Sequence, residues 1–557
     1  MPVDSENCPV GIVSEADLVG EEAGLLVEGH PVTRRLHPAP PFGRQGNRRG
    51  RVLGLKAAAE RWEGPLVRSA ITAVDRPKTL FDRQDEWDAL ASFVSDPRPG
   101  PSTGMVTGPR GQGKTYLLQE LARATGGFYF GAQEAAEAES LRRLADQLAR
   151  HTGEGPPPQW RGWEEALDTL LLLAADRPLP VVIDGFPELV RQSPTLPAAI
   201  HSACRRLRDA DRPNRARVLL CGSSMPVMHR LLAGAPAAAD FQIEIRRLDF
   251  RQGARLWTID DPVLALRVHA VVGANPAFRH DPAGEDTPAN RHDFDAWVCR
   301  TVLNPRLPLF WKAAHLIELE PEGWDRALCH STLAAITDGC ATPGAIADWL
   351  QHPATDVPHV LRLLTECGFV EGTTDAFRPG VTHYRIAEPL LAFDHAVIRP
   401  HRSALERQEA RDVWPAFRPS FEKSVLEQRF AQVCREWAVG HAAADTFGST
   451  PATASPGSLP MASGQAPLGA DVVVRDEARG HPGTLLSVGL ARCNEEMDLH
   501  HLHEVQQLVA AVAGRGEDVS RTRPALYSAA GFSPRLRAAE AHGKLILVAL
   551  DRLYHGA

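Results

Sequence analysis

The sequence predicts an α/β fold built around a doubly wound parallel sheet, and three segments carry this prediction. The first, GPRGQGKT at residues 108–115, follows an apolar pair and precedes a helical pattern. The second is the apolar run at residues 179–184, which ends in a carboxylate 70 residues after Lys114. The third, residues 216–221, leads into small polar residues. Because helix-like stretches separate these runs, we expect them to pair as parallel strands of βαβ units.

The run at residues 108–115 fits the pattern G-x-x-x-x-G-K-[ST] of a phosphate-binding loop. Its glycines permit a tight turn that directs backbone N–H groups at phosphate oxygens. Lys114 is expected to reach the β and γ phosphates of ATP, and Thr115 to offer its hydroxyl to Mg²⁺. A chance glycine turn is the alternative, which the strand before and the helix after disfavour. The predicted nucleotide-binding residues of this loop are Gly108, Pro109, Arg110, Gly111, Gln112, Gly113, Lys114 and Thr115.

Two further apolar runs supply side chains to the same predicted site. Asp184 ends the second run and is the candidate to hold the Mg²⁺ ion through its water shell. Ser223 and Ser224 follow the third run, where a small polar side chain would sense the terminal phosphate. The simpler interpretation of either serine is an N-cap between strand and helix, and the two roles are compatible.

Several segments, taken in chain order, resemble motifs of the archaeal-type P-loop ATPases, a branch near the initiator and STAND ATPases. They are FDRQDEWDAL at 81–90, GPRGQGKTYLL, VVIDGFPEL, LLCGSSMPVM and VVGANP at 271–276. The resemblance extends over residues 78–557. It implies a P-loop core, a helical lid, a winged helix and a C-terminal restriction-endonuclease-like domain.

The resemblance also exposes a departure that bears on catalysis. ATPases of this type usually place a glutamate directly after the metal aspartate, where it polarises the attacking water, and here that residue is Gly185. We therefore expect ATP hydrolysis to be weak. Glu188 is the candidate substitute, although a glutamate in the first turn of a helix is commonly a surface residue favoured by the helix dipole.

Composition limits the class of protein. The chain has 557 residues and a formal charge of −8, so it has no bulk attraction to nucleic acid or anionic membranes. Nine scattered cysteines form no metal-ligand pattern and indicate buried thiols of a reducing cytoplasm. No apolar run reaches about 18 residues, and the N-terminus does not resemble a signal peptide, so a cytoplasmic protein is expected.

The N-terminal half divides into three predicted parts. Residues 1–77 mix acidic and Gly/Pro/Arg-rich stretches and are expected to form a disordered arm. Residues 78–250 form the ATPase core, and residues 251–324 form a helical lid and connector. By the resemblance, Pro276 in Gly-Ala-Asn-Pro closes on the adenine; Ala274 departs from the usual second glycine. A helix end capped by glycine is the simpler interpretation of this segment.

Residues 325–414 have the order of a winged helix, with three short helices followed by strand, turn and strand. Its second long helix would enter a DNA major groove. That helix offers only Arg362 and His359 against Asp356 and Glu366, so the charge favours a packing or regulatory role over DNA reading. The resemblance to the archaeal-type ATPases instead favours DNA binding by this helix.

Residues 415–557 resemble a restriction-endonuclease-like domain. Such domains gather Mg²⁺ with a helix glutamate, a strand aspartate and a Glu-x-Lys pair. Asp471 keeps the aspartate, but Leu490 and Arg492 occupy the other two strand positions, and the nearest helix carboxylate is Glu427. We expect a degenerate nuclease fold with a flexible insert at residues 446–469. His500, His501 and His503 are interpreted as a surface cluster rather than a metal site.

The sequence as a whole indicates an ATP-binding P-loop NTPase that acts as a nucleotide-dependent switch. The alternative is an ATP-gated DNA-binding protein or nuclease that uses the winged helix and the C-terminal domain. DNA, a further protein and a second copy of the chain remain open as partners. The predicted catalytic residues are Lys114, Asp184, Glu188, Ser223 and Ser224; Pro276 is added to the nucleotide contacts, and Thr115 and Asp184 are the metal ligands.

Overall fold

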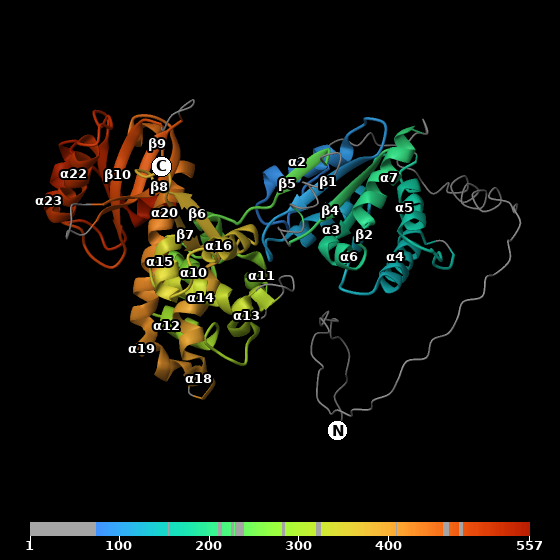
Figure 1. The fold of residues 1–557 in the computed structure, drawn as a ribbon, viewed down its shortest axis with the longest axis horizontal. Helices are drawn as coiled ribbons and strands as arrows, with labels where there is room; N and C mark the ends of the chain where they lie inside the picture. The colour runs from blue at the N-terminus through green and yellow to red at the C-terminus, as the bar shows by residue number, and fades with distance from the viewer. Residues whose placement is uncertain are drawn as a thin grey trace, which may run out of the picture. The chain divides into compact units, whose positions relative to one another are not determined.

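The first half of the structure, a computed structural model, contains the parallel sheet that the sequence predicts. Its strand order is β2-β3-β4-β1-β5, and every neighbouring pair is parallel (Figure 1). The strands are β1 (Ser102–Thr107), β2 (Phe128–Gly131), β3 (Leu179–Asp184), β4 (Ala216–Cys221) and β5 (Phe241–Glu244). The three apolar runs of the sequence are therefore adjacent strands.

The structure describes residues 74–153, 155–175, 177–209, 214–223, 228, 239–280, 285–318, 325–407, 409–460, 467–477 and 483–556. All but the last four residues of the predicted N-terminal arm lie outside these ranges. Within them, no helix is long and apolar enough to cross a membrane.

Helices cover both faces of the first sheet. Val106, Val182 and Leu219 point to the face that packs against α2 and α3. Alternate residues of the same strands, such as Val181 and Val218, point to the opposite core, which α4 to α7 complete. These helices are α2 (Gln84–Ser95), α3 (Lys114–Thr125), α4 (Glu137–Thr152), α5 (Trp163–Leu172), α6 (Phe186–Gln192) and α7 (Leu196–Asp209). Strands β3 and β4 are buried along their whole length and are largely apolar, whereas the edge strand β5 alternates half-buried and exposed residues.

A helical region follows the first sheet and ends in a small hairpin. The hairpin pairs β6 (Val370–Thr374) with β7 (Thr382–Ile386) in antiparallel fashion. The helices before it are α9 (Phe250–Leu256), α10 (Pro262–Val272), α11 (Pro276–Arg279), α12 (Phe294–Arg300), α13 (Pro308–Glu318), α14 (Arg326–Thr337), α15 (Pro343–Leu350) and α16 (Val357–Glu366). Three helices and a hairpin thus occupy residues 326–386, in the order that the sequence predicts.

A nearly continuous run of helix connects the hairpin to the C-terminal sheet. Its segments are α17 (Pro389–Phe393), the π-helix η2 (Asp394–Ile398), α18 (Arg399–Arg407), α19 (Ala410–Phe421), the π-helix η3 (Glu422–Leu426) and α20 (Glu427–Gly440). The boundary expected at residues 414–415 falls inside α19, so no break in the chain marks it. One hydrophobic core extends from Phe250 in α9 to Tyr554 near the C-terminus.

The second sheet is mixed, with strand order β12-β11-β10-β9-β8. The pairs β8/β9 and β9/β10 are antiparallel, whereas β10/β11 and β11/β12 are parallel. Its strands are β8 (Pro451–Leu459), β9 (Leu468–Asp476), β10 (Leu485–Arg492), β11 (Arg523–Ser528) and β12 (Ile546–Ala549). The accompanying helices are α21 (Ala444–Phe447), α22 (Leu499–Ala513), α23 (Pro534–Ala541) and α24 (Leu550–His555).

Strand β8 corrects the expectation of a flexible insert at residues 446–469. Nine of those residues, Pro451–Leu459, form an edge strand that pairs with β9. Pro451 opens the strand, and Pro456 lies where the register shifts between Ser455 and Gly457, the two positions at which a strand tolerates proline. The prediction was wrong because a composition typical of loops was overridden by pairing with the valine-rich β9. Residues 461–466 lie outside the described ranges.

Candidate functional site

The loop between β1 and α3 has the backbone that the glycine pattern predicts. Gly108, Gly111 and Gly113 all have positive φ, at 140°, 79° and 82°. A Cβ atom at Gly108 would lie 2.3 Å from the Ile245 carbonyl oxygen, so only glycine fits there. Gly113 ends the loop in a left-handed conformation, and α3 begins at Lys114. The N–H groups of the first turn of α3 are therefore at the end of this loop.

Lys114 is held by the loop itself. Its Nζ donates to the carbonyl oxygens of Gly108 at 2.8 Å and Pro109 at 2.7 Å. The side chain is buried, and burial lowers the pKa of Lys114 from 10.5 to about 8, partly offset by the nearby Cys221 and Asp184. The ammonium group is thus placed inside the loop with its charge poorly solvated, which favours contact with a phosphate anion.

Thr115 and Asp184 come together from α3 and β3. The Thr115 hydroxyl donates to Asp184 Oδ2 at 2.6 Å. Tyr129 of β2 donates to the same oxygen at 2.9 Å, and the Gly185 N–H donates to Oδ1 at 2.9 Å. A hydroxyl and a carboxylate held together in this way form the oxygen donor set that Mg²⁺ takes together with nucleotide phosphates. The two predicted metal ligands are therefore in contact.

Of the other predicted catalytic residues, the structure describes Ser223 and Glu188. Ser223 is half-buried two residues past the end of β4, the strand between β1 and β3. Ser224 lies outside the described part of the chain. Glu188 is in the first turn of α6 and forms an ion pair with Arg191 at 2.5 Å. Glu188 is half-buried and shares no hydrogen bond or ion pair with Asp184, so its partner among the described residues is Arg191.

The segment around Pro276 contacts the loop through its backbone. Pro276 is the first residue of α11, and the Ala277 N–H donates to the Gly111 carbonyl at 3.2 Å. Asn275 is buried and so close that a Cβ atom at Gly111 would lie 2.4 Å from its Oδ1. The predicted lid residue therefore does approach the loop.

Two residues near the loop escaped the sequence analysis. Arg83, just before α2, is buried and donates to the Gln112 carbonyl at 3.3 Å, while Glu86 accepts from it at 2.8 Å. Tyr129, described above, bonds to Asp184. Neither has a local motif of its own; the resemblance at residues 81–90 contains Arg83 without giving it a role.

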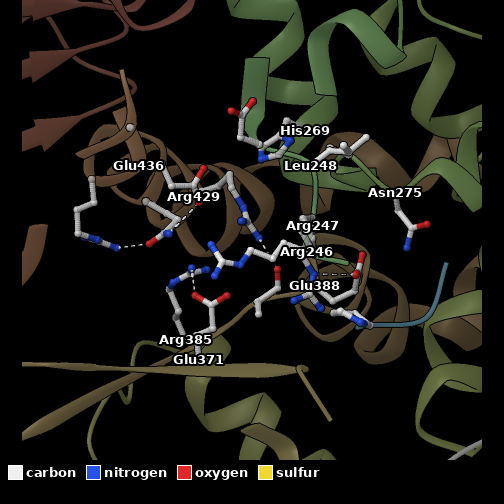
Figure 2. Close-up of a pocket in the computed structure, with 18 of the residues that line it drawn as sticks. Arg246, Arg247, Leu248, His269, Asn275, Glu371, Arg385, Glu388, Arg429 and Glu436 are labelled. Carbon is white, nitrogen blue, oxygen red and sulfur yellow. Dashed lines mark hydrogen bonds and ion pairs between the residues drawn. The ribbon is translucent and has the colours of Figure 1, made fainter. Parts of the chain in front are cut away.

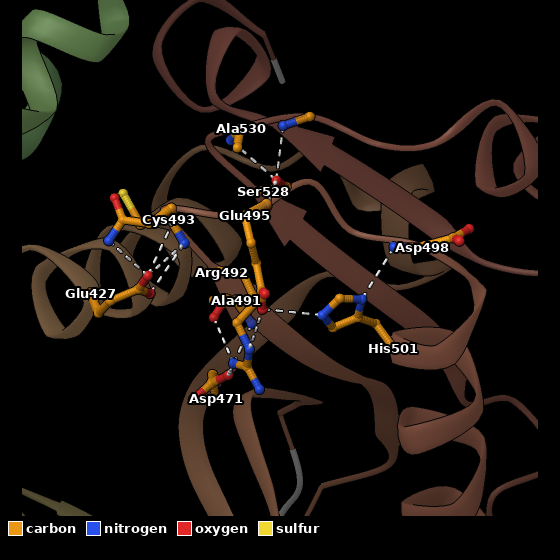
Figure 3. Close-up of polar contacts among 12 residues, drawn as sticks. Glu427, Asp471, Ala491, Arg492, Cys493, Glu495, Asp498, His501, Ser528 and Ala530 are labelled. Carbon is orange, nitrogen blue, oxygen red and sulfur yellow. Dashed lines mark hydrogen bonds and ion pairs between the residues drawn. The ribbon is translucent and has the colours of Figure 1, made fainter. Parts of the chain in front are cut away.

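A second group of polar residues lies in the C-terminal sheet (Figure 3). Asp471 of β9 accepts from Arg492 of β10 at 2.9 Å and from the Ala491 N–H at 2.9 Å. Glu427 of α20 accepts from the N–H groups of Cys493 at 3.1 Å and Asn494 at 3.2 Å. The helix and strand carboxylates of the predicted degenerate site are therefore both bound to β10 or the residues after it.

This second group lacks the features of a metal centre. Arg492 neutralises Asp471, and Leu490 is buried. Burial raises the pKa of Glu427 above its ordinary value, and Asp471 adds to that shift. Within the described ranges no cluster of three or more His, Cys, Asp or Glu side chains could hold a metal ion.

His501 corrects part of the expected surface histidine cluster. It is buried in the first turn of α22, where its Nδ1 accepts from the Asp498 N–H at 3.1 Å. Its Nε2 lies 3.2 Å from Glu495 Oε1. The histidine completes a capping box, so its role is local and structural.

No protein-family model matches the sequence, and no curated protein does. Solved structures that align with it include the Aeropyrum pernix ORC2 protein in ADPNP and ADP complexes, at 17% identity over 61% of this chain and 98% of that one, with a TM-score of 0.37. The Aeropyrum pernix ORC1 protein in complex with DNA aligns at 16% identity over 59% and 95%, with a TM-score of 0.30. Cdc6p from Pyrobaculum aerophilum aligns at 15% identity over 61% and 98%, with a TM-score of 0.31.

Proposed function

We propose that the chain is a P-loop NTPase that binds Mg-ATP and acts as a nucleotide-dependent switch with weak hydrolysis. The observation that carries the proposal is the contact between Thr115 and Asp184 beside the buried ammonium group of Lys114. Lys114 and the loop N–H groups would hold the phosphates, and Thr115 and Asp184 would hold Mg²⁺. Ser223 would sense the terminal phosphate, and Ser224 stays a candidate for the same role.

The switch is proposed to act through the parts that follow the core. We assign the core to residues 78–250, the lid and connector to 251–324, a winged helix to 325–414 and a degenerate nuclease-like domain to 415–557. The contact of Ala277 with Gly111 supports coupling between the loop and the lid. Closure of the lid over bound nucleotide would then be transmitted to the later domains.

The charges on α16 support a regulatory role for the proposed winged helix rather than recognition of DNA. The exposed face of α16 offers Arg362, whose guanidinium lies 4.0 Å from Glu366 and 3.0 Å from the His359 ring. A cation already facing a carboxylate releases few counterions from DNA. DNA, another protein and self-association remain the candidate partners of the switch.

The affinity for Mg-ATP is expected to fall above pH 8. Below that pH Lys114 is already charged in the free protein, so affinity should be flat. Above it, binding must first return a proton to Lys114, and affinity should fall by up to about tenfold per pH unit. Calorimetric titration from pH 7 to 9.5 in buffers of different ionisation enthalpy measures both affinity and proton uptake. Constant affinity without proton uptake across this range would contradict the assignment of Lys114.

Turnover of ATP by the wild-type protein is expected to be slow, and Glu188→Gln should change it by less than about tenfold. A general base contributes about 10²-fold to 10⁴-fold, and Glu188 is paired with Arg191 instead. Phosphate release under saturating Mg-ATP measures the rate. Rapid turnover that the substitution abolishes would make Glu188 the base. Gly185→Glu is a poor test, because Gly185 has a φ of 73° and a Cβ atom there would lie 2.7 Å from the Ala132 carbonyl oxygen.

The C-terminal domain is expected to cleave neither duplex nor single-stranded DNA with Mg²⁺ or Mn²⁺. Asp471 is neutralised by Arg492, whose guanidinium stays protonated and cannot replace the usual lysine. A nicking assay on supercoiled plasmid is the measurement, with Asp471→Ala as the comparison. If the wild type nicked the plasmid with metal and Asp471→Ala did not, the protein would be an ATP-gated nuclease, which is the alternative function, rather than a switch.

A further inference from the structure

A cavity of about 630 Å³ with charged and apolar lining residues lies beside the P-loop but is built mainly from other segments. The loop contributes only Pro109 and Gln112, and neither Lys114, Thr115 nor Asp184 lines it. Its walls come from the connector between β5 and α9, from α10, from the β6–β7 hairpin and from α20. A cavity of this size holds a ligand about as large as a mononucleotide.

Three arginine side chains converge in this cavity from three separate segments. Arg246 comes from the connector after β5, Arg385 from β7 and Arg429 from α20. Figure 2 shows their side chains extending towards one another near the middle of the cavity. Burial, together with the nearby Arg385, lowers the pKa of Arg429 to about 10, so the fold holds this cation at a cost.

Only one of these three cations has a carboxylate partner. Arg385 forms an ion pair with Glu371 across the hairpin. Arg429 is 8% exposed and donates to the Ala387 carbonyl at 3.4 Å. Arg246 is exposed. Across the residues that the structure describes, neither Arg246 nor Arg429 lies within 4.0 Å of a carboxylate oxygen, so an anion between them would complete the cluster.

Glu371, Glu388 and Glu436 lie near enough to Arg429 to raise its pKa and so offset part of the lowering by burial. Glu388 faces Arg247 at 3.6 Å, and burial raises its pKa. Glu436 accepts from Gln432 at 2.9 Å, and Glu244 is exposed. Asp249 lies 3.1 Å from His441. The acidic groups are therefore engaged with other partners or exposed to solvent.

We propose that this cavity is a second ligand site, which takes a small phosphate monoester with an apolar body. Guanidinium groups bind phosphate through paired N–H donors, and three of them surround one point here. Leu248, Ala274, Pro389 and Val439 are apolar residues of the same lining. A ligand held there would join the connector after the first sheet to the hairpin and to α20.

Titration calorimetry of the full chain with phenyl phosphate, in buffer without Mg²⁺, tests this proposal. The wild type should bind phenyl phosphate, with inorganic phosphate binding more weakly because it lacks the apolar body. Arg246→Gln should weaken phenyl phosphate at least tenfold, since the charged donors of one arginine are lost. Arg246 is the informative position because its side chain is exposed, and its replacement should not disturb folding.

Two control variants separate this site from the P-loop. The variant Arg411→Gln replaces an exposed arginine of α19 that does not line the cavity. It should bind phenyl phosphate as tightly as the wild type does. Lys114→Ala should also retain that binding. The proposal is overturned if the wild type does not bind phenyl phosphate, if Arg246→Gln binds it unchanged, or if Lys114→Ala abolishes it. If benzoate bound as tightly as phenyl phosphate, the site would not be specific for phosphate monoesters and would take carboxylates instead.

Discussion

Replacing Lys114 by alanine is expected to abolish the stabilisation that Mg-ATP gives the wild-type protein. A ligand at about 100 times its dissociation constant adds roughly 2.7 kcal/mol to the free energy of unfolding. Lys114 is the cation at the centre of the loop, with its Nζ on the carbonyls of Gly108 and Pro109. Without it, the phosphates lose their principal counter-charge. Thermal unfolding with and without Mg-ATP measures the effect.

The control for this experiment is Lys544→Ala, which removes an exposed lysine from the C-terminal part of the chain. That variant should keep the full shift in melting temperature. Each variant is compared with its own ligand-free form, because removing a buried lysine also changes the basal stability. If Mg-ATP raised the melting temperature of Lys114→Ala as much as that of the wild type, the P-loop would not be the nucleotide site.

Replacing Arg217 by alanine is expected to cause a large loss of stability, about 4 kcal/mol. Arg217 lies on β4 and is fully buried. Its guanidinium donates to the carbonyls of Asp96 at 2.6 Å, Arg98 at 2.6 Å and Gly100 at 2.8 Å. A hydrogen bond from a charged donor contributes about 1.5–3 kcal/mol, and the substitution removes three of them. Chemical denaturation followed by circular dichroism measures the change.

Arg205→Ala provides the comparison, since that arginine is exposed on α7 of the same core. Its effect should stay within about 0.5 kcal/mol. Because the segment from Asp96 to Gly100 leads directly into β1, Arg217→Ala should also weaken Mg-ATP binding. Equal stability of the two variants would show that water replaces the guanidinium at all three carbonyls.

Strands β3 and β4 of the first sheet could be predicted because each is a short apolar run with a distinct ending. Residues 179–184 and 216–221 were expected as strands, and the structure confirms them as β3 and β4. Strand β8 could not be found in this way, since Pro, Ser, Thr and Gly dominate its sequence. Only its pairing with β9 makes it a strand, and that pairing is a tertiary event.

The same distinction between local pattern and tertiary contact applies to the residues of the candidate site. Thr115 and Asp184 could be paired from the sequence, because a loop motif and a strand end identify them. Tyr129 could not, since it reaches Asp184 only through the parallel register that sets Gly131 beside Asp184. Arg246 and Arg429 are 183 residues apart in the sequence (429 − 246), and no local pattern connects them.

The contact between α9 and the last helix has a consequence for the order of folding during synthesis. Arg251 donates to the Leu553 carbonyl at 2.7 Å, and Phe250 packs edge-on against Tyr554. These partners are about 300 residues apart in the chain. Domains generally fold as units as they leave the ribosome, at about 5–20 residues per second. The first sheet can therefore form early, whereas α9 waits at least 15 seconds for its partner and needs protection from aggregation in that interval.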